Sequence, residues 1–241
     1  MDFNLPPRRM RDLRNLMERF TLSSQLISKV NFIHVDLALT HITASTTHNY
    51  EQLEFLGDGV LRLIVAEFLL THYPTAQVGE LAAVRDILGS DRTLFRLAES
   101  YGIERFLLAS ESASGDQDGR KTRLAESFEA ILGALYLSTH TLELIRPWLK
   151  PHLKRIAMEV MEDPARQNYK AALQEWSQGQ FKEIPTYRMV RDSQMPGDPQ
   201  RFTVEAWLHE QCLAQGKGRT IKAAEQEAAQ IAFLSRAIGP R

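Results

Sequence analysis

The feature that most constrains the fold is a change of hydrophobic period along the chain. Over residues 13–160 the apolar residues recur at helical spacing, and strand-like alternation is scarce. After residues 162–167 one amphipathic segment, 168–178, leads to alternating runs such as 201–208. The first part of the chain is therefore predicted to be all helical, and the second to contain a sheet.

The last segment, 220–238, returns to a helical period. Its apolar stripe is predicted to contain Ile221, Ala224, Ala228 and Ile231. An order of helix, strands and helix is typical of a small α+β module on a short linker. We therefore predict a multidomain chain with an all-helical domain over 1–162, a linker over 163–167 and an α+β domain over 168–241.

Composition and charge are those of an ordinary globular protein. Apolar residues make up 44% of the 241 residues, and 29 basic residues face 30 acidic ones, which argues against global disorder and favours no class of partner. A single cysteine, Cys212, excludes an intrachain disulfide and a cysteine-rich zinc site, and it fits a reducing, cytoplasmic setting. The basic N-terminus precedes no uninterrupted apolar segment, so we expect no secretory signal and no membrane span.

Three carboxylates lie within one of the most apolar runs, residues 50–70. On a helix Glu51, Glu54 and Asp58 fall within about a 60° sector, and apolar residues such as Phe55 and Leu63 surround them. Spacing alone is equally compatible with a solvated stripe. Clustered, partly buried carboxylates, however, usually need a cation, a shared proton or a basic partner.

A second acidic pair, Glu126 and Glu129, lies three residues apart in another apolar segment. If the two helices pack together, Glu54, Asp58, Glu126 and Glu129 meet in one pocket. Oxygen-rich sets of this kind suit Mg²⁺ or Mn²⁺, which near a phosphodiester activate water and stabilise the leaving oxygen. Acidic helix pairs also hold metals without hydrolysis or form salt bridges, so the chemistry alone leaves these roles open.

Three segments carry a resemblance to a known family. NYEQLEFLGDGVL (49–61), LALTH (37–41) and RLAESFEAILGALYL (123–137) closely resemble the motifs of the ribonuclease III family. The resemblance implies an all-helical endonuclease domain that forms a homodimer, followed by a double-stranded RNA-binding domain of αβββα order. It also implies cleavage of RNA duplexes to 5′-phosphate and 3′-hydroxyl ends with short 3′ overhangs.

The resemblance assigns roles to the acids. Glu54 corresponds to a metal-binding glutamate, Asp58 to the catalytic aspartate, and Glu129 to a catalytic, metal-binding glutamate. Glu126 stands where the family usually has aspartate, which lengthens its reach to metal by one methylene. Gln52 and Gly59 replace an arginine and a serine that bind no metal. Two further acids, at lower rank, match positions near the site and the dimer interface: Glu51 and Glu80.

The C-terminal region resembles the double-stranded RNA-binding domain independently. Gln174 and Glu175 correspond to positions used against the minor groove of the duplex, with little base specificity. A basic group is predicted at the start of the last helix, where backbone N–H groups also favour phosphate: Lys217, Arg219 and Lys222. Ile221 replaces a family lysine, and the loop 192–200 lacks a histidine that the family often has. Without this context, Gly216 and Gly218 indicate only a turn.

The combined reading is a homodimeric, cytoplasmic, Mg²⁺-dependent endoribonuclease for double-stranded RNA, with Mn²⁺ as a substitute, acting in rRNA, mRNA or small-RNA processing. The first alternative is a duplex-binding regulator or ribosome-associated protein with weak or no cleavage. The second is a helical phosphohydrolase for nucleotides, which leaves the C-terminal domain unexplained. Histidines such as His41 show no metal-ligand spacing and are interpreted as capping or packing residues.

Overall fold

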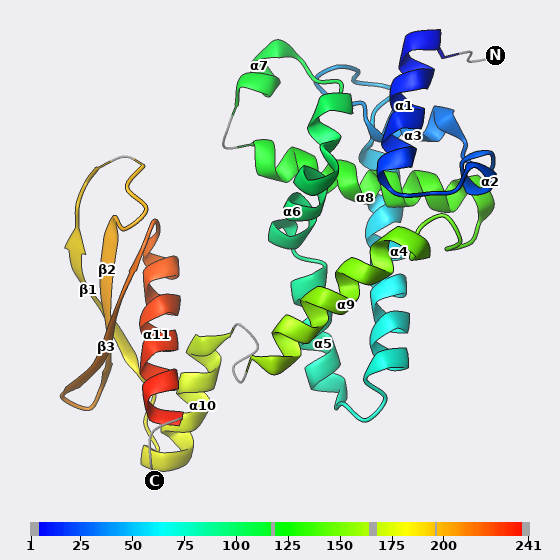
Figure 1. The fold of residues 1–241 in the computed structure, drawn as a ribbon. Helices are drawn as coiled ribbons and strands as arrows, with labels where there is room; N and C mark the ends of the chain where they lie inside the picture. The colour runs from blue at the N-terminus through cyan, green and yellow to red at the C-terminus, as the bar shows by residue number, and fades with distance from the viewer. Residues whose placement is uncertain (1–4, 117–118, 164–167, 196, 238–241) are drawn as a thin grey trace. The chain divides into compact units, whose positions relative to one another are not determined.

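The computed structural model describes residues 5–116, 119–163, 168–195 and 197–237 (Figure 1). The chain divides into two compact units, residues 1–159 and 160–241. Most of the expected linker, 164–167, lies outside the described residues. The two units are considered separately below.

The first unit is helical, as the hydrophobic period predicts. Its elements are α1 (Pro7–Arg19), α2 (Ser24–Ile27), α3 (Phe32–Ala38), α4 (Glu51–His72), α5 (Val78–Leu88), α6 (Asp91–Tyr101), the 3₁₀ helix η1 (Ile103–Phe106), α7 (Glu111–Gly115), α8 (Arg120–Thr139) and α9 (Arg146–Glu162), whose last residues belong to the second unit. In its described part the only β pairing is an isolated bridge between Thr40 and Leu108. None of the described helices is long and apolar enough to cross a membrane.

Helices α4 and α8 form the centre of this unit. Most of α8 is buried, including Leu124, Ala125, Phe128, Ala130, Ile131, Leu132, Ala134 and Leu135. A Cβ atom on Gly57 of α4 would lie 1.8 Å from the carbonyl oxygen of Glu129, and one on Gly133 of α8 would lie 2.3 Å from that of Leu53. The two backbones therefore touch with no side chain between them, and only glycine fits at either position.

The polar composition of segment 110–121 is typical of a surface loop, yet part of the segment is helical. Its first half is the short helix α7, which begins where the hydroxyl of Ser110 accepts a hydrogen bond from the backbone N–H of Ala113. Serine commonly caps helices in this way. Helix α8 already begins at Arg120, so the segment contributes to two helices.

The second unit has the predicted αβββα order. It contains α10 (Tyr169–Phe181), β1 (Thr186–Asp192), β2 (Phe202–Leu208), β3 (Gln211–Gly218) and α11 (Ile221–Ala237). The strands form an antiparallel sheet in the order β1-β2-β3, with both helices on one face (Figure 1). The core between them is formed by Tyr169, Leu173, Ala206, Ala228, Ala229 and Ala232.

Helix α11 buries a narrower stripe than the sequence predicts. Ala224 and Ala228 are buried, but Ile221 and Ile231 are 43% and 46% exposed. Gly216 and Gly218 lie in β3 rather than in a turn, and Cβ atoms there would lie 2.1 Å from the Ala228 nitrogen and 2.5 Å from the Ala224 nitrogen. The strand approaches the helix so closely that only small residues fit between them.

Candidate active site

The contact between α4 and α8 carries the four acids that the sequence singles out. Glu54 lies in the first turn of α4 and Asp58 one turn later, while Glu126 and Glu129 lie one turn apart on α8. All four side chains are partly buried. Because Gly57 meets the backbone of Glu129 directly, the two acidic rows lie on helices in closest contact.

The pKa values of two of these acids reflect that proximity. Burial, together with the negative charges of Asp58 and Glu54, raises the pKa of Glu129 to about 7. Burial also raises the pKa of Glu54, followed in effect by the charges of Glu126 and Glu51. Carboxylates on both helices therefore repel one another across the contact, which favours binding of a proton or a cation there.

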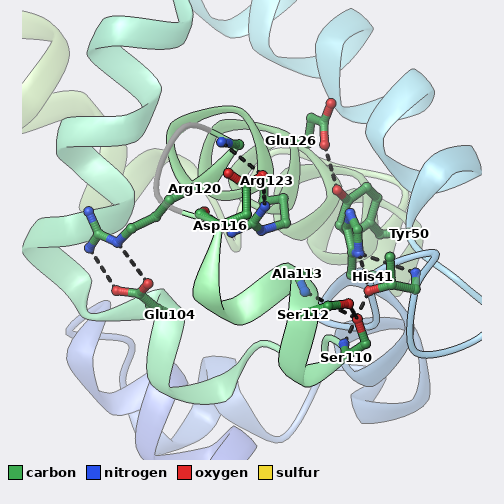
Figure 2. Close-up of polar contacts among 12 residues, drawn as sticks. His41, Tyr50, Glu104, Ser110, Ser112, Ala113, Asp116, Arg120, Arg123 and Glu126 are labelled. Atoms are coloured by element: carbon green, nitrogen blue, oxygen red, sulfur yellow. Dashed lines mark hydrogen bonds and ion pairs between the residues drawn. The ribbon is translucent and has the colours of Figure 1, made fainter. Parts of the chain in front are cut away.

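The other two acids have partners of their own. The hydroxyl of Tyr50 donates to Oε2 of Glu126 at 2.5 Å (Figure 2). The Nε atom of Arg62 donates to both carboxylate oxygens of Asp58, at 2.8 and 3.0 Å. Within the described ranges, no three Asp, Glu, His or Cys side chains are already gathered to hold an ion.

The donor set nonetheless fits a hard divalent cation. Four carboxylates supply the oxygen ligands that Mg²⁺ and Mn²⁺ prefer. The pKa values of Glu54 and Glu129 are raised because their ionised forms are disfavoured by burial and by neighbouring carboxylates. A bound cation would compensate this negative charge. The cation would have to compete with Arg62 for the Asp58 carboxylate. The Arg62–Asp58 ion pair is exposed, and ion pairs of this kind contribute little to stability.

Three residues near these acids were not singled out from the sequence. Arg62 lies four residues after Asp58 on the same helix, so the i, i+4 spacing was an available signal. Tyr50 and Asp91, whose charge also raises the pKa of Glu129, come from a helix start and from α6. No local pattern connects either residue with α8.

The lower-ranked residues occupy peripheral positions. Glu51 is exposed, and its charge acts on Glu54. The Glu80 carboxylate accepts a hydrogen bond from the backbone N–H of Gln77 at 2.9 Å and closes a capping box at the start of α5. Gln52 is exposed, and a side chain at Gly59 would meet open space.

In the second unit the predicted basic group is exposed at the junction of β3 and α11. Lys217 lies in β3, Arg219 lies two residues before α11, and Lys222 is the second residue of that helix. The backbone N–H of Lys217 donates to the Glu227 carboxylate, which anchors the strand to the helix. The predicted groove-contacting pair on α10 is also exposed: Gln174 and Glu175.

Comparisons with known proteins match both units. Residues 51–140 match the family described as Ribonuclease III domain, and residues 169–235 match the Double-stranded RNA binding motif. A protein of Nostoc sp. named Ribonuclease 3 2 is 53% identical over 95% of this chain and 94% of its own length. Ribonuclease 3 of Gloeobacter violaceus is 46% identical over 96% of this chain and 94% of its own length. The nuclease domain of ribonuclease III from Campylobacter jejuni matches with a TM-score of 0.49 and 26% identity over 62% of this chain and 96% of that domain.

Proposed function

The chain belongs to the ribonuclease III family, and on that basis we propose that it is an endoribonuclease for double-stranded RNA in which Glu54, Asp58, Glu126 and Glu129 bind the divalent metal. The observation that carries the assignment of these residues is the direct backbone contact of α4 and α8 at Gly57 and Gly133. In that contact the two acidic rows lie side by side, and charges from the opposite row contribute to the raised pKa values of Glu54 and Glu129.

The acids of this chain have distinct tasks in the proposed reaction. Glu129 has a pKa of about 7 without a cation, so it must lose a proton before it can act as a metal ligand near neutral pH. Asp58 must release Arg62, which is then free to face a phosphate. A bound divalent ion would supply an activated water and stabilise negative charge on the leaving oxygen.

We propose Mg²⁺ as the metal, with Mn²⁺ as a substitute. Carboxylate oxygens suit both ions, and the site contains no predicted nitrogen or sulfur ligand. The products are expected to carry 5′-phosphate and 3′-hydroxyl ends with short 3′ overhangs.

For RNA binding we propose the basic group Lys217, Arg219 and Lys222 together with Gln174 and Glu175. Exposed cations beside the start of a helix favour phosphate. The expected substrates are duplex segments of rRNA, mRNA and small-RNA precursors, and the proposed location is the cytoplasm, which suits an exposed single cysteine, Cys212.

We further propose that the chain forms a homodimer through α4. Phe55, Leu63 and Leu70 are 86%, 56% and 63% exposed and lie within about an 80° sector of the helix. An exposed apolar stripe of this kind marks an interaction surface. A second copy of the same helix would cover it.

The function is tested by cleavage of a long, labelled RNA duplex in Mg²⁺, Mn²⁺ or EDTA. The unchanged protein should cut in either metal and not in EDTA, while Glu129→Gln should cut at least about 100-fold more slowly and still bind the duplex. Glu143→Gln is the matched control, because it removes an exposed carboxylate paired with Lys29 and should leave cleavage unchanged. Duplex binding without cutting in either metal would contradict the proposal.

A further inference from the structure

The tyrosine that immediately precedes α4 makes one hydrogen bond to the acidic site. Its hydroxyl lies 2.5 Å from Oε2 of Glu126, and the two side chains point toward one another (Figure 2). Tyr50 is only 2% exposed, whereas Glu126 is partly exposed. The donor is thus fixed in the core, and the acceptor is a side chain whose charge acts on the neighbouring carboxylates of Glu54 and Glu129.

The position of the Tyr50 ring is fixed from several sides. Its backbone N–H donates to the carbonyl of Thr40 at 3.0 Å, and its carbonyl accepts the N–H of Glu54 at 2.9 Å. The His41 ring packs against it edge to face, with ring centroids 5.5 Å apart. A buried ring held in this way leaves its hydroxyl in one place.

The segment 39–43, which contacts Tyr50 through Thr40 and His41, is hydrogen-bonded to the segment 108–110. The backbone N–H of His41 donates to the carbonyl of Leu108, and the N–H of Leu108 donates to the carbonyl of Leu39, both at 2.8 Å. The hydroxyl of Thr43 lies 2.7 Å from Nδ1 of His41 and accepts the N–H of Ser110 at 3.1 Å. Segments 39–43 and 108–110 therefore form one frame behind Tyr50.

From this geometry we propose that Tyr50 is a positioning residue for metal binding, an inference that rests on the proposed function of Glu126. A glutamate side chain has three rotatable bonds, and restricting them on metal binding costs free energy. The Tyr50 hydroxyl holds Oε2 beforehand and leaves Oε1 for the cation. Partners behind a metal ligand typically change metal affinity by about 10- to 100-fold.

The simpler alternative is that the two residues satisfy each other's hydrogen-bonding needs and nothing more, as buried polar groups usually do. The alternatives differ in how the two residues couple. A positioning role requires that loss of the hydroxyl matters only while the Glu126 carboxylate can reach it. A purely structural role affects folding stability and leaves metal binding alone.

The experiment is a double-mutant cycle in the full-length protein with Tyr50→Phe, Glu126→Asp and both changes together. Calorimetric titration with Mn²⁺ in the absence of RNA gives the dissociation constant, and cleavage at varied Mg²⁺ gives the half-saturating concentration. We expect Tyr50→Phe to raise both values about 10-fold. In the Glu126→Asp background the same change should alter them less than about 2-fold, because the shorter carboxylate is withdrawn from the phenol.

Tyr101→Phe is the matched control, since it removes a hydroxyl that lies 2.7 Å from Nε2 of His152 in the same unit. It should lower the melting temperature and leave the Mn²⁺ dissociation constant unchanged. Unchanged Mn²⁺ binding in Tyr50→Phe, or an equal loss in both Glu126 backgrounds, would refute the positioning role. If Tyr50→Phe does not fold, Glu126→Asp alone must weaken Mn²⁺ binding to the same extent, and unchanged binding there refutes the role. Failure of the unchanged protein to bind Mn²⁺ or to cut RNA would instead refute the proposed function.

Discussion

At the scale of single residues, the site depends on carboxylates that repel one another. The effect on pKa is large at Glu129, because this residue is partly buried and the charges of Asp58 and Glu54 lie nearby. Its pKa rises from an ordinary value of 4.5 to about 7. The site is therefore least stable, without a cation, in the range where all its acids are ionised.

This gives a pH-dependent prediction for stability in EDTA. Between pH 4.5 and about 7 the folded chain holds a proton on Glu129 that the unfolded chain has released, so the free energy of unfolding falls as pH rises through that window. Glutamine does not ionise, so the free energy of unfolding of Glu129→Gln should not fall in this window. At pH 8 the variant should be more stable than the unchanged protein by about 2 kcal/mol, a value that is reduced for solvent screening. At pH 4 the two should be equal.

Urea denaturation of both proteins at pH 4 and pH 8, with EDTA or with Mg²⁺, measures the effect. Added Mg²⁺ should stabilise only the protein that retains Glu129, because binding to the folded state alone raises its stability. A Glu129→Gln protein that is less stable at pH 8 in EDTA would show that this carboxyl is not under electrostatic strain.

The four acids could be proposed from the sequence, through their spacing and the family resemblance. Their partners could not, except for Arg62, whose i, i+4 relation to Asp58 is local. Tyr50 reaches Glu126 across 76 positions of sequence. Phe55 and Leu63 were interpreted as neighbours in an apolar surround, yet both are exposed, since hydrophobicity does not distinguish a core face from a face that another molecule can cover.

At the scale of elements, glycines set the closest contacts in both units. Gly57 and Gly133 allow α4 and α8 to touch, and Gly216 and Gly218 allow β3 to touch α11. Periodicity predicted the helices and strands themselves, because it reports which face of an element is buried. It does not report how close two backbones come, so the close approach of β3 to α11 at Gly216 and Gly218 is not predicted by the sequence.

We predict that Gly133→Ala destabilises the helical unit by about 3 kcal/mol or more. The added Cβ would lie 2.3 Å from the Leu53 carbonyl oxygen, and backbone atoms cannot move aside as a flexible side chain can. Gly59→Ala is the control on α4, where a Cβ meets nothing within 4 Å. That change should stabilise the protein by about 0.5 to 1 kcal/mol.

Chemical denaturation monitored by circular dichroism provides both values. Cleavage should fall with Gly133→Ala even under conditions where the protein is fully folded, because separating the helices also separates the acids. Equal stability changes for the two glycine substitutions would contradict a direct backbone contact.

At the scale of the whole molecule, the acids and the basic group belong to different compact units. Net charge near zero, −1 for the chain, conceals this division. The sequence predicted the order of the two folds because the hydrophobic period changes between them. The sequence contains no visible heptad repeat, so self-association is predicted only from the family resemblance, and no surface for it is predicted.

Replacing Lys217, Arg219 and Lys222 together by alanine should weaken duplex binding without altering the site of cleavage. Each lost phosphate contact lowers the salt dependence, so the slope of log K against log salt should become less steep by up to about 3. Binding titrations at several salt concentrations measure the slope. A triple change at Lys150, Lys154 and Arg155, exposed cations of α9, removes equal charge and should leave the slope nearly unchanged; an equal effect would show that the contact is non-specific.

Phe55→Glu should convert the proposed dimer to monomers, because it places a charge in the centre of an apolar interface. Sedimentation equilibrium gives the association constant, which we expect to fall at least about 100-fold. Met158→Glu, at an apolar position of α9 that is 46% exposed, adds the same charge elsewhere and should leave the mass unchanged. An unchanged protein that sediments as a monomer at all concentrations would exclude the α4 dimer.

The contact of α4 and α8 also limits how such a site can diverge. Where two main chains already touch at Gly57 and Gly133, substitutions elsewhere in the core can rotate the helices about the contact but cannot bring them closer. If the four acids bind the metal as proposed, ion selectivity at this site is set by the length of the acidic side chains rather than by the spacing of the helices. Glu126, whose carboxylate accepts a hydrogen bond from Tyr50, extends one methylene further than an aspartate would at the same backbone position.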